Sequence, residues 1–267
     1  AVLAAAATRV FLLRRREGEA DAAAHVRPRT RDTRAKPVGL DPHECGNALK
    51  EAIADGMVMI AQAKETRKSS VETPAQLESF HHAEDHEFFN ESFYYNGCDW
   101  DTKDRIVTRI SHRGKGGKRS YVFLLLDIAG EGELALEEDV EAETALDGSP
   151  TALGLKYTCE VPMLRWRITY SGPMRRGCTH PLDKAALAKA ETVHVDVDLV
   201  YDTDTPLFWY MRDDHPKCLA RNLTQEPWGL NFLKTCIKRT ADHGHYEDFG
   251  RLRGTVRVKS SASEPAR

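Results

Sequence analysis

Residues 81–87 form the densest group of side chains in the sequence that could bind a metal or transfer protons. His82 and His86 are four residues apart, so on a helix they would share one face, as in H-E-x-x-H zinc sites. The interval between them reads Ala-Glu-Asp, so the glutamate does not directly follow the first histidine. A metal ion also needs further ligands and groups that orient them. We therefore expect a polar segment before the first strand, with neither a metal nor another cofactor.

No pattern typical of nucleophilic or nucleotide-dependent catalysis is present. The sequence has no G-x-S-x-G turn, and the glycine-rich run 113–118 lacks both the G-x-x-x-x-G-K-[ST] spacing and a following helix. The six cysteines include no C-x-x-C pair. We expect a solvated loop at 113–118 and packed, reduced thiols, and we assign no catalytic residue.

Two predicted strands, 164–171 and 192–201, alternate charged and apolar side chains. Arg165 and Arg167 share one face of the first strand, and Asp196 and Asp198 share one face of the second. If the strands are neighbours, cross-strand ion pairs would contribute about 0.2–1 kcal/mol each. Either this charged face is solvated, or it lines a wide barrel and orients a ligand.

If the charged face of these two strands lines the inside of a barrel, the protein could be an enzyme. A hydratase- or isomerase-like barrel acting on an apolar substrate could use paired titratable groups as acid and base. The candidates are Asp85, His86, His194, Asp196 and Asp198. This alternative requires that some of these carboxylates point into a closed cavity.

Aromatic side chains are the most suggestive set for binding, because many of them lie on or beside predicted strands. Our candidate ligand-binding residues are Tyr94, Phe123, Trp166, Tyr170 and Trp209. A barrel lined by such rings could hold a small apolar ligand. The alternative is an ordinary aromatic core, since small barrels fill with their own side chains.

These side chains need elements to position them, and the pattern predicts mainly strands. Strands are expected at 87–96, 105–111, 119–128, 153–161, 164–171, 192–201 and 251–259, with a hairpin turn at Asn96-Gly97. Short helices are expected at 182–190 and 228–239. Strands in hairpin order without alternating helices indicate a mainly β fold, an antiparallel barrel or sandwich.

The amino-terminal part differs in character. Residues 1–16 are apolar and end in Arg14–Arg16, which predicts a truncated membrane-proximal segment with its arginines on the cytoplasmic side. Residues 17–42 read as a linker, 43–69 as a helix, 80–259 as the β domain and 260–267 as a tail.

The predicted helix carries an apolar stripe, formed by Leu49, Ile53, Met57 and Ile60. A third hypothesis is therefore that the protein is an interaction module, in which this helix docks on a partner. This hypothesis requires that the stripe be exposed in the isolated chain. Packing of the stripe against the barrel would contradict it.

Composition limits the remaining classes. The 267 residues are 41% hydrophobic with a net charge of −3, which argues against a strongly basic nucleic-acid binder, so we expect no nucleic-acid partner. No uninterrupted apolar run reaches the ~20 residues that a membrane-spanning helix needs.

Four segments, from about residue 81 to residue 258, resemble one family in combination. They read HAEDHEFFNESFYYNG at 82–97, MLRWRITYSG at 163–172, QEPW at 225–228 and HGHYEDFGRLRG at 243–254. They are similar to the amino-terminal region of animal phosphoenolpyruvate-synthase-like proteins, which are abundant in arthropods. None of the segments is a catalytic signature.

The resemblance implies a lipocalin-like antiparallel barrel, similar to carotenoid-hydratase-like proteins. It also implies an ATP-binding domain and a phosphohistidine domain further along the polypeptide, whose residues map onto nothing in this sequence. Our leading hypothesis is a non-catalytic module, in the cytoplasm or at the cytoplasmic face of a membrane. It would bind a small apolar or amphipathic ligand or dock onto its own phosphotransferase domains.

Overall fold

The computed structural model describes two units, which are taken in turn. It describes residues 7–13, 48–69, 73–81, 89–145, 147–177, 184–226, 228–229, 232 and 245–259. Residues 4–24, 74–207 and 247–267 form a β unit, and residues 1–3, 25–73 and 208–246 form a helical unit. The predicted β region 80–259 therefore carries an insertion that belongs to the helical unit.

The β unit contains most of the strands. Its elements are β1 (Ala7–Leu13), α2 (Pro74–Leu77), β2 (Asn90–Cys98), β3 (Arg105–Arg113), η1 (Lys115–Gly117), β4 (Arg119–Ile128), β5 (Gly132–Glu141), β6 (Glu143–Thr144), β7 (Pro150–Ala152), β8 (Leu155–Val161), β9 (Arg165–Arg176), α3 (Lys184–Lys189), β10 (Glu191–Thr203) and β12 (Tyr246–Lys259).

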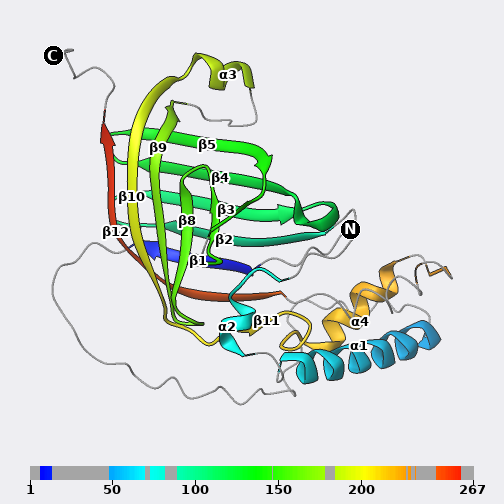
Figure 1. Ribbon diagram of the computed structural model, residues 1–267. Coiled ribbons are helices and arrows are strands. Elements are labelled where there is room, and N and C mark those ends of the chain that lie inside the picture. Colours follow the sequence, from blue (N-terminus) through cyan, green and yellow to red (C-terminus); the bar gives the residue numbers. More distant parts are fainter. Residues whose placement is uncertain are drawn as a thin grey trace, which may run out of the picture. The chain divides into compact units, whose positions relative to one another are not determined.

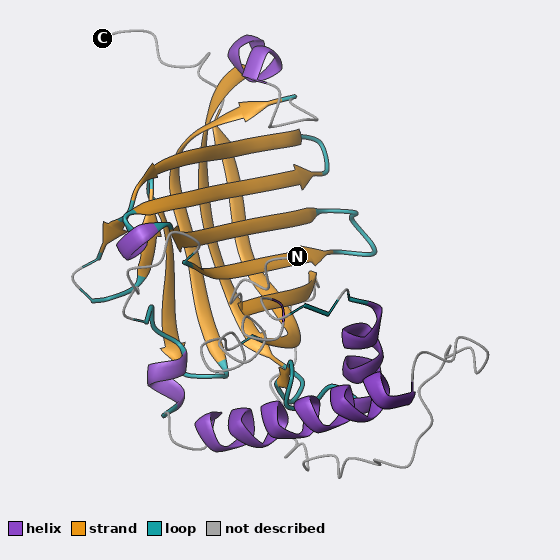
Figure 2. Ribbon diagram, turned by 90° about the vertical axis from the view of Figure 1, so that its right-hand side faces the viewer, coloured by secondary structure: helices purple, strands orange, loops and turns teal. Residues whose placement is uncertain are grey.

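One large sheet joins these strands in the order β10-β12-β1-β2-β3-β4-β5-β9-β8-β7-β6, and β9 also pairs with β10. The pairings are antiparallel except for the two that β1 makes, with β2 and β12. Figures 1 and 2 show β8, β9 and β10 crossing β2–β5. The predicted mainly β, antiparallel class is thus confirmed.

The core lies between these crossing sets of strands. In β10, the alternate residues from Val193 to Tyr201 are all buried, and in β9 the same holds for Trp166, Ile168 and Tyr170. They form one contiguous cluster with residues of β2–β5. Period-two alternation therefore predicts the inward face of both strands correctly, because every second side chain of a strand points the same way.

The predicted hairpin turn at Asn96-Gly97 is wrong. Both residues lie inside β2, where they pair with Val107 and Ile106 of β3. The turn comes after β2, where the Asp99 carboxylate accepts hydrogen bonds from the backbone N–H of Asp101 (2.8 Å) and Thr102 (3.1 Å). An Asn-Gly pair is a local preference only, and the cross-strand pairing of β2 with β3 overrides it.

The apolar start of the sequence contributes a strand. Ala7–Leu13 form β1, while the rest of the segment 1–16, the linker 17–42 and the tail 260–267 lie outside the described residues. Within the described part of the chain, no helix is both long and apolar enough to cross a membrane.

The helical unit is built from α1 (Ala48–Ser69), β11 (Phe208–Trp209) and α4 (Pro216–Gln225). Small side chains of α1, Ala54 and Val58, pack against Ala220 of α4. The buried Glu65 carboxylate accepts a hydrogen bond from Trp209 Nε1 at 2.7 Å.

The predicted apolar stripe of α1 lies mainly on the opposite side of this helix from the α4 contact. Leu49, Ile53 and Ile60 are 67%, 45% and 61% exposed, and Met57 is half-buried. Within the helical unit these three side chains are left uncovered, and docking through the stripe stays a prediction. The predicted helix 228–239 falls largely outside the described residues, and Trp228 and Gly229 are not helical.

Candidate functional site

The charged side chains of β9 and β10 lie on the side of these strands that faces away from the core. The two strands are neighbours, which was the condition for cross-strand ion pairs, and they pair in antiparallel register. Arg167 makes two hydrogen bonds to Asp198, at 2.7 and 2.8 Å, and Arg165 binds Asp202 at 2.6 Å. The predicted cross-strand ion pairing of arginines with aspartates is thus confirmed for Arg167 and Asp198, while Arg165 pairs with Asp202, which lies beyond the predicted strand.

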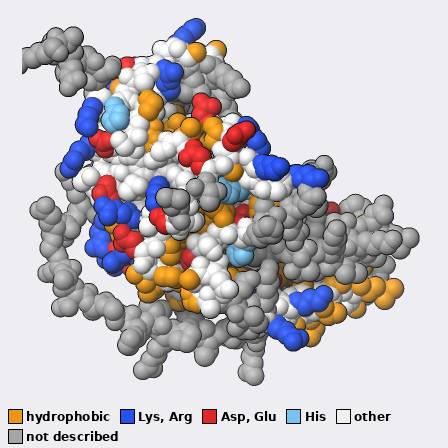
Figure 3. Space-filling model, viewed as in Figure 1, with side chains coloured by type: hydrophobic (Ala, Val, Ile, Leu, Met, Phe, Trp, Pro, Cys, Tyr) orange, Lys and Arg blue, Asp and Glu red, His pale blue; other side chains and the backbone are white. Residues whose placement is uncertain are grey.

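Strand β12 extends these contacts into what we call the ion-pair face, formed by Arg165, Arg167, Asp196, Asp198, Asp202, Asp204, Arg251, Arg253 and Lys259. Figure 3 shows positive and negative side chains side by side over β9, β10 and β12. Lys259 binds Asp196 at 2.7 Å, and Arg253 adds a second arginine to Asp202. Each of the four aspartates has at least one cationic partner.

These partners shift the aspartate pKa values downward. Hydrogen bonds from Lys259, Ser171 and His194 hold the pKa of Asp196 far below its usual range, and Arg167 lowers the pKa of Asp198. None of the acid–base candidates His194, Asp196 and Asp198 faces the core, so the interior arrangement predicted as one alternative is wrong for these strands. The other two candidates, Asp85 and His86, lie outside the described residues.

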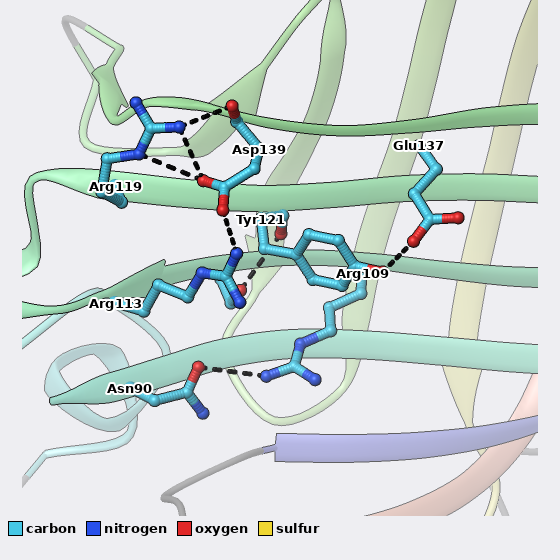
Figure 4. Close-up of polar contacts among 8 residues, drawn as sticks. Asn90, Arg109, Arg113, Arg119, Tyr121, Glu137 and Asp139 are labelled. Carbon is cyan, nitrogen blue, oxygen red and sulfur yellow. Dashed lines mark hydrogen bonds and ion pairs between the residues drawn. The ribbon is translucent and has the colours of Figure 1, made fainter. Parts of the chain in front are cut away.

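A second outward face, on β2–β5, has a different composition. Directly opposed residues of neighbouring antiparallel strands share a face, and the register places Tyr94, Arg109, Phe123 and Glu137 in one row across four strands. We call the surface around this row the arginine–aromatic face. Its members are Tyr94, Arg109, Arg113, Arg119, Tyr121, Phe123, Glu137 and Asp139, several of which are drawn in Figure 4.

The rings of this face contact one another edge to face. The centroids of Tyr94 and Phe123 are 6.2 Å apart and those of Tyr121 and Phe123 are 5.8 Å apart, with interplanar angles of 73° and 66°. Val107 and Leu125 oppose each other in the adjacent row, and both are half-buried, as the three rings are. The result is a strip of apolar surface that is only partly covered.

The polar groups on one side of this strip are engaged with each other. The Asp139 carboxylate binds both Arg113 and Arg119, whose hydrogen bonds and charges hold its pKa below the usual range. The Arg113 guanidinium also lies over the Tyr121 ring, 4.7 Å from its centroid. Figure 4 shows Asp139 held between the two arginines.

The Tyr121 hydroxyl donates to the Glu137 carboxylate. Burial and this hydrogen bond raise the pKa of Tyr121 to about 12, so its phenol stays protonated at neutral pH. Glu137 is half-buried, and its negative charge lies at the β5 end of the row that contains Arg109.

Arg109 differs from Arg113 and Arg119 on the same face and from the arginines of the ion-pair face. Its Nη2 donates to the side-chain oxygen of Asn90 at 3.1 Å, and among the described residues it has no carboxylate partner. Its Nε is buried and makes no hydrogen bond within the described structure. Burial lowers the pKa of Arg109, and the nearby charge of Arg113 adds to this effect. A partly buried cation that lacks an anionic partner is energetically costly.

The structure brings together two of the five predicted ligand-binding residues. Tyr94 and Phe123 meet on the arginine–aromatic face, whereas Trp166 and Tyr170 belong to the core of the β unit. Trp209 lies in the helical unit, where it stacks on Tyr246 with 5.1 Å between centroids. The set as a whole does not line one site.

Arg109 is the functional candidate that the sequence analysis missed. The available signal was its position in the strand 105–111, where it alternates with Ile106, Thr108 and Ile110 and so shares the outward face with Val107. That pattern places the side chain on a face, but it does not show whether a carboxylate lies beside it. In the described part of the chain, no group of three or more His, Cys, Asp or Glu side chains could hold a metal ion.

The comparison with known proteins gives a family without an assigned activity. A model of a family of unknown function, DUF8627, matches residues 64–266. Neither the curated proteins nor the solved structures include a match to the chain.

Proposed function

The chain belongs to the DUF8627 family, and we propose that its β unit is a non-catalytic module that binds a small amphipathic ligand on the arginine–aromatic face. The observation that carries this proposal is the partly covered apolar strip of Tyr94, Phe123, Val107 and Leu125. Exposed apolar strips bordered by polar groups are typical of ligand-binding surfaces.

The outward face is a better binding surface than the interior of the sheet. Inside, Tyr95 lies 5.0 Å from Tyr157 and 5.9 Å from Tyr201, between ring centroids, and Phe93 lies 5.2 Å from Trp166. These side chains form one contiguous core. A ligand would have to displace them, whereas on the outward face it would cover rings that are already partly exposed.

The expected affinity is modest. A ligand that covers about 200 Å² of apolar surface would gain about 5 kcal/mol at ~25 cal/mol per Å². The loss of translational and rotational freedom reduces this gain, so we expect a Kd of about 1 mM or weaker from apolar contact alone.

Binding of 2-naphthalenemethanol, measured by calorimetry, tests the proposal. This neutral probe has a flat apolar ring system and one hydroxyl. We expect saturable binding to the wild type and at least about fivefold weaker binding to Tyr94→Ala, because the variant removes one ring of the strip.

Phe249→Ala is the matched control for this experiment. Phe249 is an aromatic residue of β12 in the same unit, and it is 51% exposed. Its removal should leave the affinity unchanged. Equal losses in both variants, or no saturable binding to the wild type, would contradict the proposal.

The resemblance supports a setting for this module in a longer polypeptide. In that setting, the module belongs to a phosphoenolpyruvate-synthase-like phosphotransferase with ATP-binding and phosphohistidine domains. The membrane-proximal leader that the resemblance implies supports a position at the cytoplasmic face of a membrane, while the apolar residues Ala7–Leu13 themselves form β1 of the sheet. The full-length transcript tests the setting: those domains should follow the module, and a transcript without them would overturn it.

A second function, docking through α1, is favoured by the exposed side chains of Leu49, Ile53 and Ile60. The occupant we propose is a phosphotransferase domain of the same polypeptide, which the resemblance supports. A photo-cross-linking residue at position 60 of the full-length protein should capture that domain. The same residue at position 64, an exposed lysine of α1, is the control, and equal capture at both positions would count against docking.

A further inference from the structure

The geometry points to a monocarboxylate as the ligand of the arginine–aromatic face, with Arg109 as the residue that receives the carboxylate. This inference rests on the proposed function, because it names the chemical class of the ligand at the same site. It begins from the distribution of charge on this face.

The two acidic side chains of the face are already engaged, and neither serves Arg109. Asp139 binds Arg113 and Arg119, and Glu137 accepts the hydroxyl hydrogen of Tyr121. Of the three arginines among its eight members, Arg109 is the one that has no carboxylate partner among the described residues.

The hydrogen bonding of Arg109 is as incomplete as its charge pairing. A guanidinium carries five N–H donors, and in the described structure Arg109 donates to the neutral amide oxygen of Asn90. Its buried Nε has none. A carboxylate would accept two parallel N–H groups of the guanidinium and would neutralise its charge at the same time.

The surroundings of Arg109 restrict both the charge of the ligand and the kind of group that carries its carboxylate. Glu137 lies at the end of the same row, so a second negative charge on the ligand would be repelled. Tyr94 and Phe123 are the direct cross-strand neighbours of Arg109, so the atoms attached to the carboxylate meet rings. A single negative charge on a flat apolar body therefore fits, and a phosphate dianion fits less well.

Three probes that share one ring system test this inference by calorimetry at pH 7: 2-naphthoate, the neutral 2-naphthalenemethanol and 2-naphthyl phosphate. We expect wild-type protein to bind naphthoate at least about tenfold more tightly than the alcohol, because a charge-assisted hydrogen bond is stronger than a neutral one. The phosphate should bind more weakly than naphthoate. This comparison needs no variant.

Substitutions of Arg109 and Arg105 then show which residue causes the preference for naphthoate over the alcohol. In Arg109→Gln the affinities for 2-naphthoate and for the alcohol should differ by no more than about twofold. Arg109→Lys should keep part of the preference for naphthoate, because lysine retains the charge without the planar pair of donors. Arg105→Gln is the matched control, since Arg105 lies on the same strand and the same side of the sheet but outside the arginine–aromatic face, is exposed and has Asp127 nearby. It should leave the preference unchanged.

The outcomes separate this inference from the proposed function. If the alcohol and naphthoate bind the wild type equally well, the carboxylate is not recognised, while the binding face stands. Tighter binding of the phosphate than of naphthoate would overturn the assignment of a monocarboxylate. An undiminished preference in Arg109→Gln would overturn the role of Arg109, and the absence of binding by all three probes would overturn both proposals.

Discussion

The two outward faces of the sheet use arginine in opposite ways. On the ion-pair face, Arg165, Arg167, Arg251 and Arg253 each have an aspartate partner. On the arginine–aromatic face, Arg109 is half-buried beside rings and has a single neutral acceptor in the described structure. The residue type is the same, and only the partners and the degree of burial differ.

This difference separates a structural role from a binding role. Exposed ion pairs contribute little each, about 0–1 kcal/mol, so the ion-pair face mainly supports the pairing of β9, β10 and β12. Each of its five cations has an aspartate partner, which leaves little to attract a ligand. Arg109 is not neutralised in this way, and the same physical rule that makes it costly in the free protein makes it a receptor for an anion.

The largest expected change in stability comes from replacing a glycine of β12, the strand that carries part of the ion-pair face. Gly254 of β12 has a φ of 149°, and a Cβ there would collide with the carbonyl oxygen of Asp198 on β10. We expect Gly254→Ala to lower the free energy of unfolding by about 3 kcal/mol, measured in urea, through this collision and the backbone strain.

Gly130→Ala isolates the contribution of the backbone in this experiment. Gly130 has a φ of 85°, but a Cβ there would meet open space. Its replacement should cost about 1 kcal/mol. Equal costs in the two variants would show that close approach of β12 to β10 does not matter to the fold.

An intermediate effect is expected from Asp202, which holds Arg165 and Arg253 and has only 16% of its side chain exposed. Burial raises its pKa, but hydrogen bonds from the two arginines outweigh burial and keep the pKa below its usual range. Asp202→Asn should therefore cost about 1 kcal/mol at pH 7, as measured by urea unfolding.

The pH dependence of this cost follows from the sign of the shift. A carboxyl with a lowered pKa in the folded protein stabilises it fully above the unfolded pKa of about 3.9. The contribution is lost as the pH falls through the lower, folded value. The difference between Asp202→Asn and the wild type should shrink as the pH falls below about 4, and a difference that stayed undiminished down to pH 2 would contradict the ion-pair account. Asp127→Asn, at an exposed 3.9 Å pair, should show almost no cost at either pH.

The smallest effect concerns Arg109 without ligand. Replacing this cation with an apolar side chain of similar length removes the desolvation cost, so Arg109→Met should leave the free energy of unfolding unchanged or raise it by up to about 1 kcal/mol. Arg165→Met on the ion-pair face should lower it slightly, because Asp202 loses a partner. A clear loss of stability in Arg109→Met would mean that Arg109 has a structural role.

Much of the fold follows from sequence periodicity. Both ends of β4, Arg119 and Ile128, were predicted, and β8, β9 and β10 differ from the predicted ranges only at their ends. These strands alternate strictly or are rich in β-branched and aromatic residues, so local preference and the buried face agree.

The elements that sequence reasoning missed lack this agreement. β5, Gly132–Glu141, is rich in glutamate, and it forms a strand because Leu134 points into the core while the backbone pairs with β4. The helix α4 was missed although Pro216 at its first turn, preceded by the capping His215, is a recognisable helix start.

The candidate site was predictable only in part, for a physical reason. Alternation places Tyr94 and Phe123 on strands, but the register that makes them neighbours through Arg109 depends on pairings between strands. Trp209 was grouped with them because nothing in the periodicity shows that residues 208–246 belong to another unit. The missing partner of Arg109 is a property of three-dimensional packing, which the order of residues does not contain.

The most direct test of the central claim observes the Arg109 Nε–H by ¹H–¹⁵N NMR during a titration with 2-naphthoate. Its resonance is assigned by its absence from Arg109→Lys. The account predicts a saturable shift of this resonance with naphthoate, a much smaller shift with 2-naphthalenemethanol, and no shift of the Nε–H of Arg165, which is bound to Asp202. An Arg109 resonance that stays in place while naphthoate binds would contradict the account.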